Sequence, residues 1–121
     1  REEVPEKYRA VGQPVLVGGT MGTCSFILHG TEKGMKDTFG SAIHGAGRQM
    51  SRHQAKRQWK GVNIVEQLAK KGIIIKGHSI GGVAEEAPGA YKDVEEVVDV
   101  MHLSGVAKKV VMVKPLISVK G

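Results

Sequence analysis

Residues 40–52 combine one histidine with small neighbours and two arginines. His44 has three glycines within five positions, and Arg48 and Arg52 follow it by four and eight residues. Glycine has no side chain and tolerates unusual backbone angles, so a bulky group can approach the imidazole closely. Guanidinium groups bind phosphate oxygens in a bidentate way, and a histidine can attack phosphorus as a nucleophile. Taken alone, the same pattern also fits a glycine-rich turn around a solvated histidine.

A second glycine-rich stretch, Gly18-Gly19-Thr20-Met21-Gly22-Thr23, resembles a phosphate-binding loop in composition. Its backbone amides and the Thr20 and Ser25 hydroxyls could hold a nucleotide. However, the stretch lacks the lysine and the spacing of a P-loop and is not a GxGxxG fingerprint. A plain hairpin turn therefore stays open as the alternative.

The metal-binding residue types are scattered along the chain. The five histidines, at positions 29, 44, 53, 78 and 102, show no HxxxH or HExxH spacing, and Cys24 has no CxxC partner. We therefore expect no metal site formed by this chain alone. The apolar neighbours of Cys24 predict a packed thiol. Glu85 and Glu86 precede a turn, which predicts a helix start or simple surface exposure.

Composition limits the class of protein. With 121 residues the chain has the size of one domain, and 18 basic against 12 acidic residues give a formal net charge of +6. This excess favours polyanionic partners, although it also fits a protein that is merely basic. No apolar run reaches the roughly 20 residues that cross a membrane, and no signal peptide opens the chain. With one cysteine, we expect a cytoplasmic protein without a membrane partner.

The first half predicts two strands and two possible helical segments. Residues 1–13 are expected to be extended, and strands are expected over 14–17 and 23–28, joined by 18–22. Residues 31–38 predict a charged loop or a short helical turn, and 39–43 an extended segment. Ser51 would cap a helix reaching about Trp59. Four-residue spacing would then align Arg48, Arg52 and Lys56 on one helical face. We expect the two arginines to contact phosphate and the lysine to be solvated.

The second half alternates helices and strands. Apolar spacing predicts helices over 62–71 and roughly 91–104, ended by Gly72 and Gly105. Strands are expected over 73–75 and 110–119, with Pro115 marking an edge or a bend. Residues 77–82 read as a loose turn around His78. The fold class is therefore predicted to be α+β, a mixed sheet with flanking helices.

Several blocks together carry a family resemblance: GQPVL at 12–16, GTMGT at 19–23, FGS at 39–41, HGAGR at 44–48, MSR at 50–52, EEAP at 85–88 and the closing VKG. In them the chain resembles the RtcB family, RNA ligases of tRNA splicing and RNA repair. The resemblance runs over essentially all residues, 1–121. It implies the carboxyl-terminal portion of an RtcB-like catalytic domain and fold.

The resemblance implies a GTP- and manganese-dependent enzyme. It would join 2',3'-cyclic phosphate or 3'-phosphate ends of tRNA exon halves or broken RNA to 5'-hydroxyl ends. His44 would accept guanylate from GTP and pass it to the RNA 3'-phosphate. The missing upstream part would supply the manganese ligands, and the isolated piece is expected to be inactive. Ile43 and Thr20 stand where many relatives carry cysteine and serine, and 77–82 departs from the family pattern.

The same matching assigns roles to individual residues. His44 and Arg48 would be catalytic, and Arg48 and Arg52 would bind phosphates of GTP or RNA. The remaining residues would form the nucleotide site: Gly18, Gly19, Thr20, Met21 and Ser25 in its wall, Gly45, Ala46 and Gly47 beside the phosphate, Tyr91 near the base and Lys120 at the guanine.

Two other functions stay open. The chain could be a non-catalytic RNA-binding module that uses the basic residues between 48 and 60, or an inactive piece that works only with its upstream part. Aromatic residues make up 4% of the chain, which argues against base stacking on single strands.

Overall fold

The computed structural model describes residues 2–120, so Arg1 and Gly121, the last residue of the closing block, lie outside it. The architecture is α+β, as predicted. The elements in chain order are the 3-10 turn η1 (Glu6–Tyr8), β1 (Pro14–Val17), β2 (Ser25–Gly30), α1 (Glu32–Thr38), α2 (Arg52–Gln58), α3 (Gly61–Lys70), β3 (Ile74–Gly77), α4 (Ile80–Glu85), the 3-10 turn η2 (Pro88–Ala90), α5 (Val94–Ser104), β4 (Ala107–Val113) and β5 (Ile117–Lys120). No described helix has the length and apolar content needed to span a membrane.

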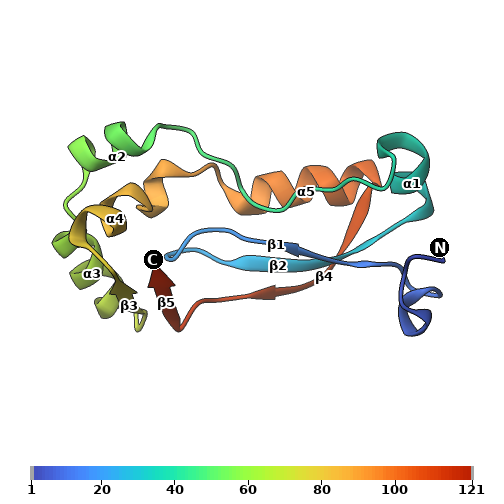
Figure 1. The fold of residues 1–121 in the computed structure, drawn as a ribbon, viewed down its shortest axis with the longest axis horizontal. Coiled ribbons are helices and arrows are strands. Elements are labelled where there is room, and N and C mark those ends of the chain that lie inside the picture. Colours follow the sequence, from blue (N-terminus) through green and yellow to red (C-terminus); the bar gives the residue numbers. More distant parts are fainter. Residues whose placement is uncertain (1, 121) are drawn as a thin grey trace.

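One layer is a three-stranded antiparallel sheet in the order β1-β2-β4. Helix α5 runs along this sheet, and α2, α3 and α4 gather with β3 at one end of the molecule (Figure 1). The buried side chains under α5 form the first core: Val17, Cys24, Phe26, Leu28, Ala46, Val94, Val98 and Ala107. Alternation along β1 and β2 places their buried residues on the helix side, which is the usual pattern of a one-sided sheet.

The second layer is a parallel pair, β3 with β5, packed against α3 and α4. Its core consists of Met21, Ile64, Leu68, Ile73, Ile75, Val83 and Ala87. Met21 comes from the glycine-rich stretch between β1 and β2. That stretch therefore joins the two cores.

The prediction of a loose turn over 77–82 is wrong. Helix α4 begins at Ile80, because the Ser79 hydroxyl caps it by accepting from the Gly82 amide. Val83 and Ala84 are buried, and this packing outweighs the poor helix propensity of two glycines. A Cβ on Gly61 would lie 2.2 Å from the Ile80 carbonyl oxygen, so the close approach of α3 and α4 requires that glycine.

The chain after α5 forms two strands, whereas one strand over 110–119 was predicted. Pro115 lies between β4 and β5, which belong to different sheets; the bend predicted there is confirmed. Helix α5 begins at Val94, three residues later than predicted, because the Asp93 carboxylate caps it. Its end at Gly105, with a φ of 80°, is confirmed.

Three further segments of the first half differ from expectation or decide between alternatives that the sequence left open. Of the two alternatives predicted for 31–38, the helical one is confirmed, since α1 begins at Glu32 and is capped by the Thr31 hydroxyl. Residues 39–43 are not extended throughout, because Phe39 and Gly40 adopt left-handed angles (φ 54° and 75°) that turn the chain after α1. Residues 1–13 are interrupted by the 3-10 turn η1 rather than fully extended.

Candidate functional site

The segment that carries His44 is paired with the end of β1. The Gly18 amide donates to the His44 carbonyl oxygen at 3.0 Å, and the Ala46 amide donates to the Gly18 carbonyl oxygen at 2.9 Å. These bonds make a parallel bridge between Gly18 and Gly45. Ala46 is buried in the first core, whereas His44 is exposed. The backbone is therefore anchored while the imidazole side chain faces solvent.

The other side of the segment is fixed to the chain before α5. The Lys92 amide donates to the Gly47 carbonyl oxygen, and the Gln49 amide donates to the Ala90 carbonyl oxygen, both at 2.9 Å. Gly47 has a φ of 78°, a left-handed angle that favours glycine. Residues 44–49 thus form a strap held at both ends.

Arg48 lies in this strap, before α2, so the prediction that it shares a helical face with Arg52 and Lys56 is wrong. Its Nε donates to the Met50 carbonyl oxygen at 3.1 Å and one terminal nitrogen donates to the Glu85 carbonyl oxygen at 2.6 Å. The other terminal nitrogen lies 3.1 Å from the Tyr91 hydroxyl and 3.5 Å from Glu86 Oε1. The guanidinium also lies 4.8 Å from the centre of the Tyr91 ring. All three of its nitrogens therefore have partners within the protein.

Arg52 is the first residue of α2, and its side chain is 64% exposed. Its Nε lies 3.9 Å from Glu86 Oε1. The predicted cap, Ser51, is confirmed, since its hydroxyl accepts from the Gln54 amide. Of the two predicted phosphate contacts, Arg52 is the one that faces solvent.

The carboxylates at the end of α4 were expected at a helix start or freely exposed, and both expectations are wrong. Glu85 ends α4 and Glu86 follows it, and their side chains are 27% and 23% exposed. Glu85 pairs with Lys56 at 2.6 Å, and this hydrogen bond lowers the pKa of the carboxyl group. Folding brings both acids against the basic residues of the strap and α2.

Tyr91 links this cluster to the strap. Its hydroxyl donates to Glu86 Oε2 in a short hydrogen bond and accepts from Arg48. Burial raises the pKa of the Tyr91 phenol, and the hydrogen bond to Glu86 raises it further. The phenol therefore stays protonated and keeps its donor on Glu86.

The glycine-rich loop between β1 and β2 is stabilised by its own hydroxyl groups. The Ser25 hydroxyl accepts from the Gly19 amide at 3.2 Å, and the Thr23 hydroxyl accepts from the Thr20 amide at 3.1 Å. The Thr20 hydroxyl accepts from the Gly22 amide at 3.2 Å. These amides therefore already have partners, unlike those of an open phosphate cradle. Met21 is buried, so its side chain belongs to the core.

A groove of about 810 Å³ runs beside this loop. Thr20 and Tyr91, two residues of the predicted nucleotide site, both line it. Its other lining residues include two lysines and three acids: Lys92, Lys114, Asp93, Glu95 and Glu96. No sequence motif marks Lys92 or Lys114, since they follow η2 and β4 and meet only in the fold.

Residues 1–121 match, over the whole chain, the family described as tRNA-splicing ligase RtcB. The chain belongs to the RtcB family.

Individual RtcB proteins agree with this. The chain is 50% identical over 119 residues to the tRNA-splicing ligase RtcB of Methanococcus maripaludis and 53% identical over 120 residues to that of Pyrococcus horikoshii. It is 50% identical over 118 residues to the RNA-splicing ligase RtcB homolog 2 of Entamoeba dispar. These alignments cover 98%, 99% and 98% of the chain but 25%, 14% and 22% of the respective relatives. The chain thus spans a quarter or less of their length.

Four RtcB blocks of the sequence, GTMGT, HGAGR, MSR and EEAP, meet in one region, whereas residues of the GQPVL and FGS blocks line a separate pocket. The blocks around Gly18, His44 and Arg48 are joined by the bonds above, and Arg48 and Arg52 bring in the acids of the EEAP block. Lys120, in the closing block, lies in β5 beside Gly77 of β3, in a different sheet from β1, the strand that Gly18 follows. The structure gives Lys120 no described bond to the strap.

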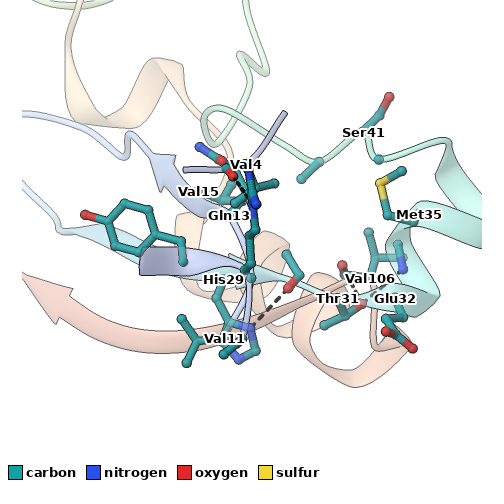
Figure 2. Close-up of a pocket in the computed structure, with 18 residues that line it drawn as sticks. Val4, Val11, Gln13, Val15, His29, Thr31, Glu32, Met35, Ser41 and Val106 are labelled. Atoms are coloured by element: carbon teal, nitrogen blue, oxygen red, sulfur yellow. Dashed lines mark hydrogen bonds between the residues drawn. The ribbon is translucent and has the colours of Figure 1, made fainter. Parts of the chain in front are cut away.

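Among residues 2–120 of this RtcB chain, no group of three histidine, cysteine or acidic side chains could hold a metal ion. The described residues therefore do not fit a manganese site. The pocket in Figure 2, about 260 Å³, lies between the N-terminal segment, β2 and α1, where Val11, His29 and Met35 line it. None of the predicted site residues lines that pocket.

Proposed function

We propose that this chain is the guanylate-accepting part of an RNA ligase of the RtcB family. The complete enzyme joins RNA ends that carry a 2',3'-cyclic phosphate or a 3'-phosphate to ends that carry a 5'-hydroxyl. The observation that carries the proposal is the exposed imidazole of His44 on a strap whose backbone is bonded on both sides. A nucleophile fixed in this way loses little freedom when its substrate binds.

The first step balances as a substitution at phosphorus. The unprotonated nitrogen of the His44 ring attacks the α-phosphorus of GTP. A phosphorus–nitrogen bond forms, the bond to the β-phosphate oxygen breaks, and pyrophosphate leaves. Histidine suits this step because an imidazole nitrogen is a nucleophile that can form a covalent intermediate at phosphorus.

The next two steps use the guanylate as an activator. An oxygen of the RNA 3'-phosphate attacks the guanylate phosphorus, and the bond to His44 breaks. The 5'-hydroxyl of the second RNA end then attacks the activated 3'-phosphorus, a phosphodiester forms, and GMP leaves with the bonding electrons. A 2',3'-cyclic end enters after water opens it to the 3'-phosphate.

The arginines differ in the roles that their geometry supports. Arg52, exposed at the start of α2, binds an RNA or nucleotide phosphate through its fork. Arg48, whose nitrogens bond to protein groups, holds the strap and Tyr91 in place beside the groove. The groove next to Thr20 and Tyr91 accommodates the guanosine. Manganese, when bound, neutralises phosphate charge, and its ligands come from outside the described residues.

A non-catalytic RNA-binding module is the second candidate, favoured by the exposed basic side chains of α2. Such a module binds RNA with steep salt dependence and without any need for GTP. The two candidates separate when a full-length RtcB polypeptide with this segment is incubated with GTP labelled either on the α- or on the γ-phosphate. The ligase proposal requires label from the α-phosphate alone to stay on the protein. Retention of neither label supports the binding module.

A further inference from the structure

Glu86 lies between two basic side chains, Arg48 and Arg52, and has no role in the steps above. Its side chain is 23% exposed. One oxygen accepts from the Tyr91 hydroxyl, and the other faces Arg48 at 3.5 Å and Arg52 at 3.9 Å. A single carboxylate thus contacts both arginines that follow the histidine.

The two arginines beside this carboxylate differ in exposure and in their bonds to the protein. Arg48 is 21% exposed and its nitrogens bond to protein groups. Arg52 is 64% exposed, and the atom nearest to Glu86 is its Nε, not a terminal nitrogen. The contact with Glu86 therefore holds the side of the Arg52 guanidinium and leaves its end for another anion.

We propose that Glu86 is a positioning residue that orients Arg52 toward the terminal phosphate of the RNA substrate. The inference rests on the proposed function, in which Arg52 is the phosphate contact. A long arginine side chain at a helix start has many rotamers, and a fixed carboxylate beside Nε selects those that point the fork at the substrate. Tyr91 and Arg48 hold the carboxylate itself in place.

Electrostatics are compatible with a phosphate next to Glu86. Two guanidinium groups surround the one carboxylate, so this group of three side chains keeps a net positive charge. The neighbouring Glu85 pairs with Lys56 at 2.6 Å, and the charges of Arg52 and Arg48 act on it more weakly than Lys56 does. An incoming phosphate therefore meets attraction from Arg52 that exceeds repulsion from Glu86.

The chain offers a matched control for the test. Glu85→Gln removes the same charge one residue away, from a side chain that faces Lys56, and leaves the carbonyl oxygen that Arg48 binds. Glu86→Gln removes the charge next to Arg52, and its amide oxygen can still accept from Tyr91.

The experiment measures RNA binding by a full-length RtcB polypeptide with this segment. The readout is the ratio of affinities for one oligonucleotide ending in a 3'-phosphate and the same oligonucleotide ending in a 3'-hydroxyl. A general loss of folded protein lowers the active fraction but leaves this ratio unchanged. We expect Glu86→Gln to reduce the preference for the phosphate end about threefold and Glu85→Gln to change it less than about 1.5-fold.

A double-mutant cycle identifies the residue through which Glu86 acts. In an Arg52→Ala background, Glu86→Gln should have no further effect on the ratio. Equal effects of the two glutamine variants, or an undiminished effect of Glu86→Gln without Arg52, would overturn the inference. The ratio needs no guanylylation, so a failure of the histidine chemistry shows up separately, as absent guanylate labelling of the unmodified protein.

Discussion

Gly18 and His44 are joined through their backbones, with the Gly18 amide 3.0 Å from the His44 carbonyl oxygen. They lie 26 positions apart in the sequence, and strand β2 and helix α1 lie in that interval. The bond belongs to a bridge that lies directly after β1, and it fixes the position of the His44 backbone next to that strand. The glycine-rich loop and the histidine strap are therefore one structural unit.

The first prediction concerns the two glycines at the start of that unit. A Cβ at Gly19 would lie 1.8 Å from the Cys24 carbonyl oxygen, whereas at Gly18 the nearest atom would be 3.8 Å away. Gly19→Ala should therefore destabilise the protein by about 3 kcal/mol, and Gly18→Ala by less than about 0.5 kcal/mol. Urea unfolding of both variants measures the difference. Similar unfolding midpoints for the two would contradict this account of the loop.

The second prediction concerns pH and Tyr91. Burial and the hydrogen bond to Glu86 raise the pKa of its phenol above the ordinary value of 10.0. The folded protein then keeps the proton that the unfolded chain loses, so the stabilisation is complete below pH 10 and disappears as the pH rises through the folded pKa.

Tyr91→Phe tests this directly. The unfolding free energy of the unmodified protein should fall more steeply above pH 10 than that of the variant. The ultraviolet difference between the two proteins, which reports phenolate, should develop only above that pH. Titration of this difference below pH 10 would show that the phenol is not bonded to Glu86 as described.

The third prediction concerns Cys24, whose prediction as a packed thiol is confirmed by an exposed fraction of 3%. Burial raises the pKa of the thiol, and the nearby Glu95 carboxylate raises it further. Because the thiolate is the reactive form, alkylation at pH 8 should be slow. Glu95→Gln should accelerate it several-fold. The adjacent Glu96→Gln, which changes the same charge without this contact, should not.

The fourth prediction concerns the sheet face opposite α5. Leu16, Ile27 and Val111 are directly paired across β1, β2 and β4, and Leu16 and Val111 are 70% and 43% exposed. An apolar row of this kind promotes association between chains. We expect the 121-residue chain to self-associate in sedimentation experiments and Leu16→Lys to lower this association. Leu103→Lys, at an 82% exposed position on α5, serves as the control and should have a smaller effect.

Local patterns in the sequence predict much of the fold. The strand at 14–17, the helix around 62–71 and the glycine end of α5 follow from short-range apolar spacing and capping residues. Helix α4 could not be found in this way, because its stability comes from burying Val83 and Ala84 against α3. Strands β4 and β5 belong to different sheets because β4 pairs with β2 and β5 pairs with β3, and local sequence patterns do not show which strands pair.

The candidate site shows the same division. His44 and the small residues around it are recognisable in the sequence because they are contiguous. The Arg48–Glu86–Tyr91 cluster is not, since its members lie 38 and 43 positions from Arg48 along the chain. Folding also separates Arg48 from Arg52. Arg48 lies in the strap and bonds to protein groups, whereas Arg52 lies at the exposed start of α2. Spacing alone predicts one common face for both.

The central claim is that His44 accepts guanylate, and peptide mapping by mass spectrometry tests it most directly. A full-length RtcB polypeptide with this segment is incubated with GTP and manganese, digested under conditions that preserve phosphorus–nitrogen bonds, and compared with His44→Ala. We expect the peptide containing His44 to gain the mass of one guanylate and the variant to gain none on any peptide. A guanylate on another residue, or one that persists in the variant, would contradict the account.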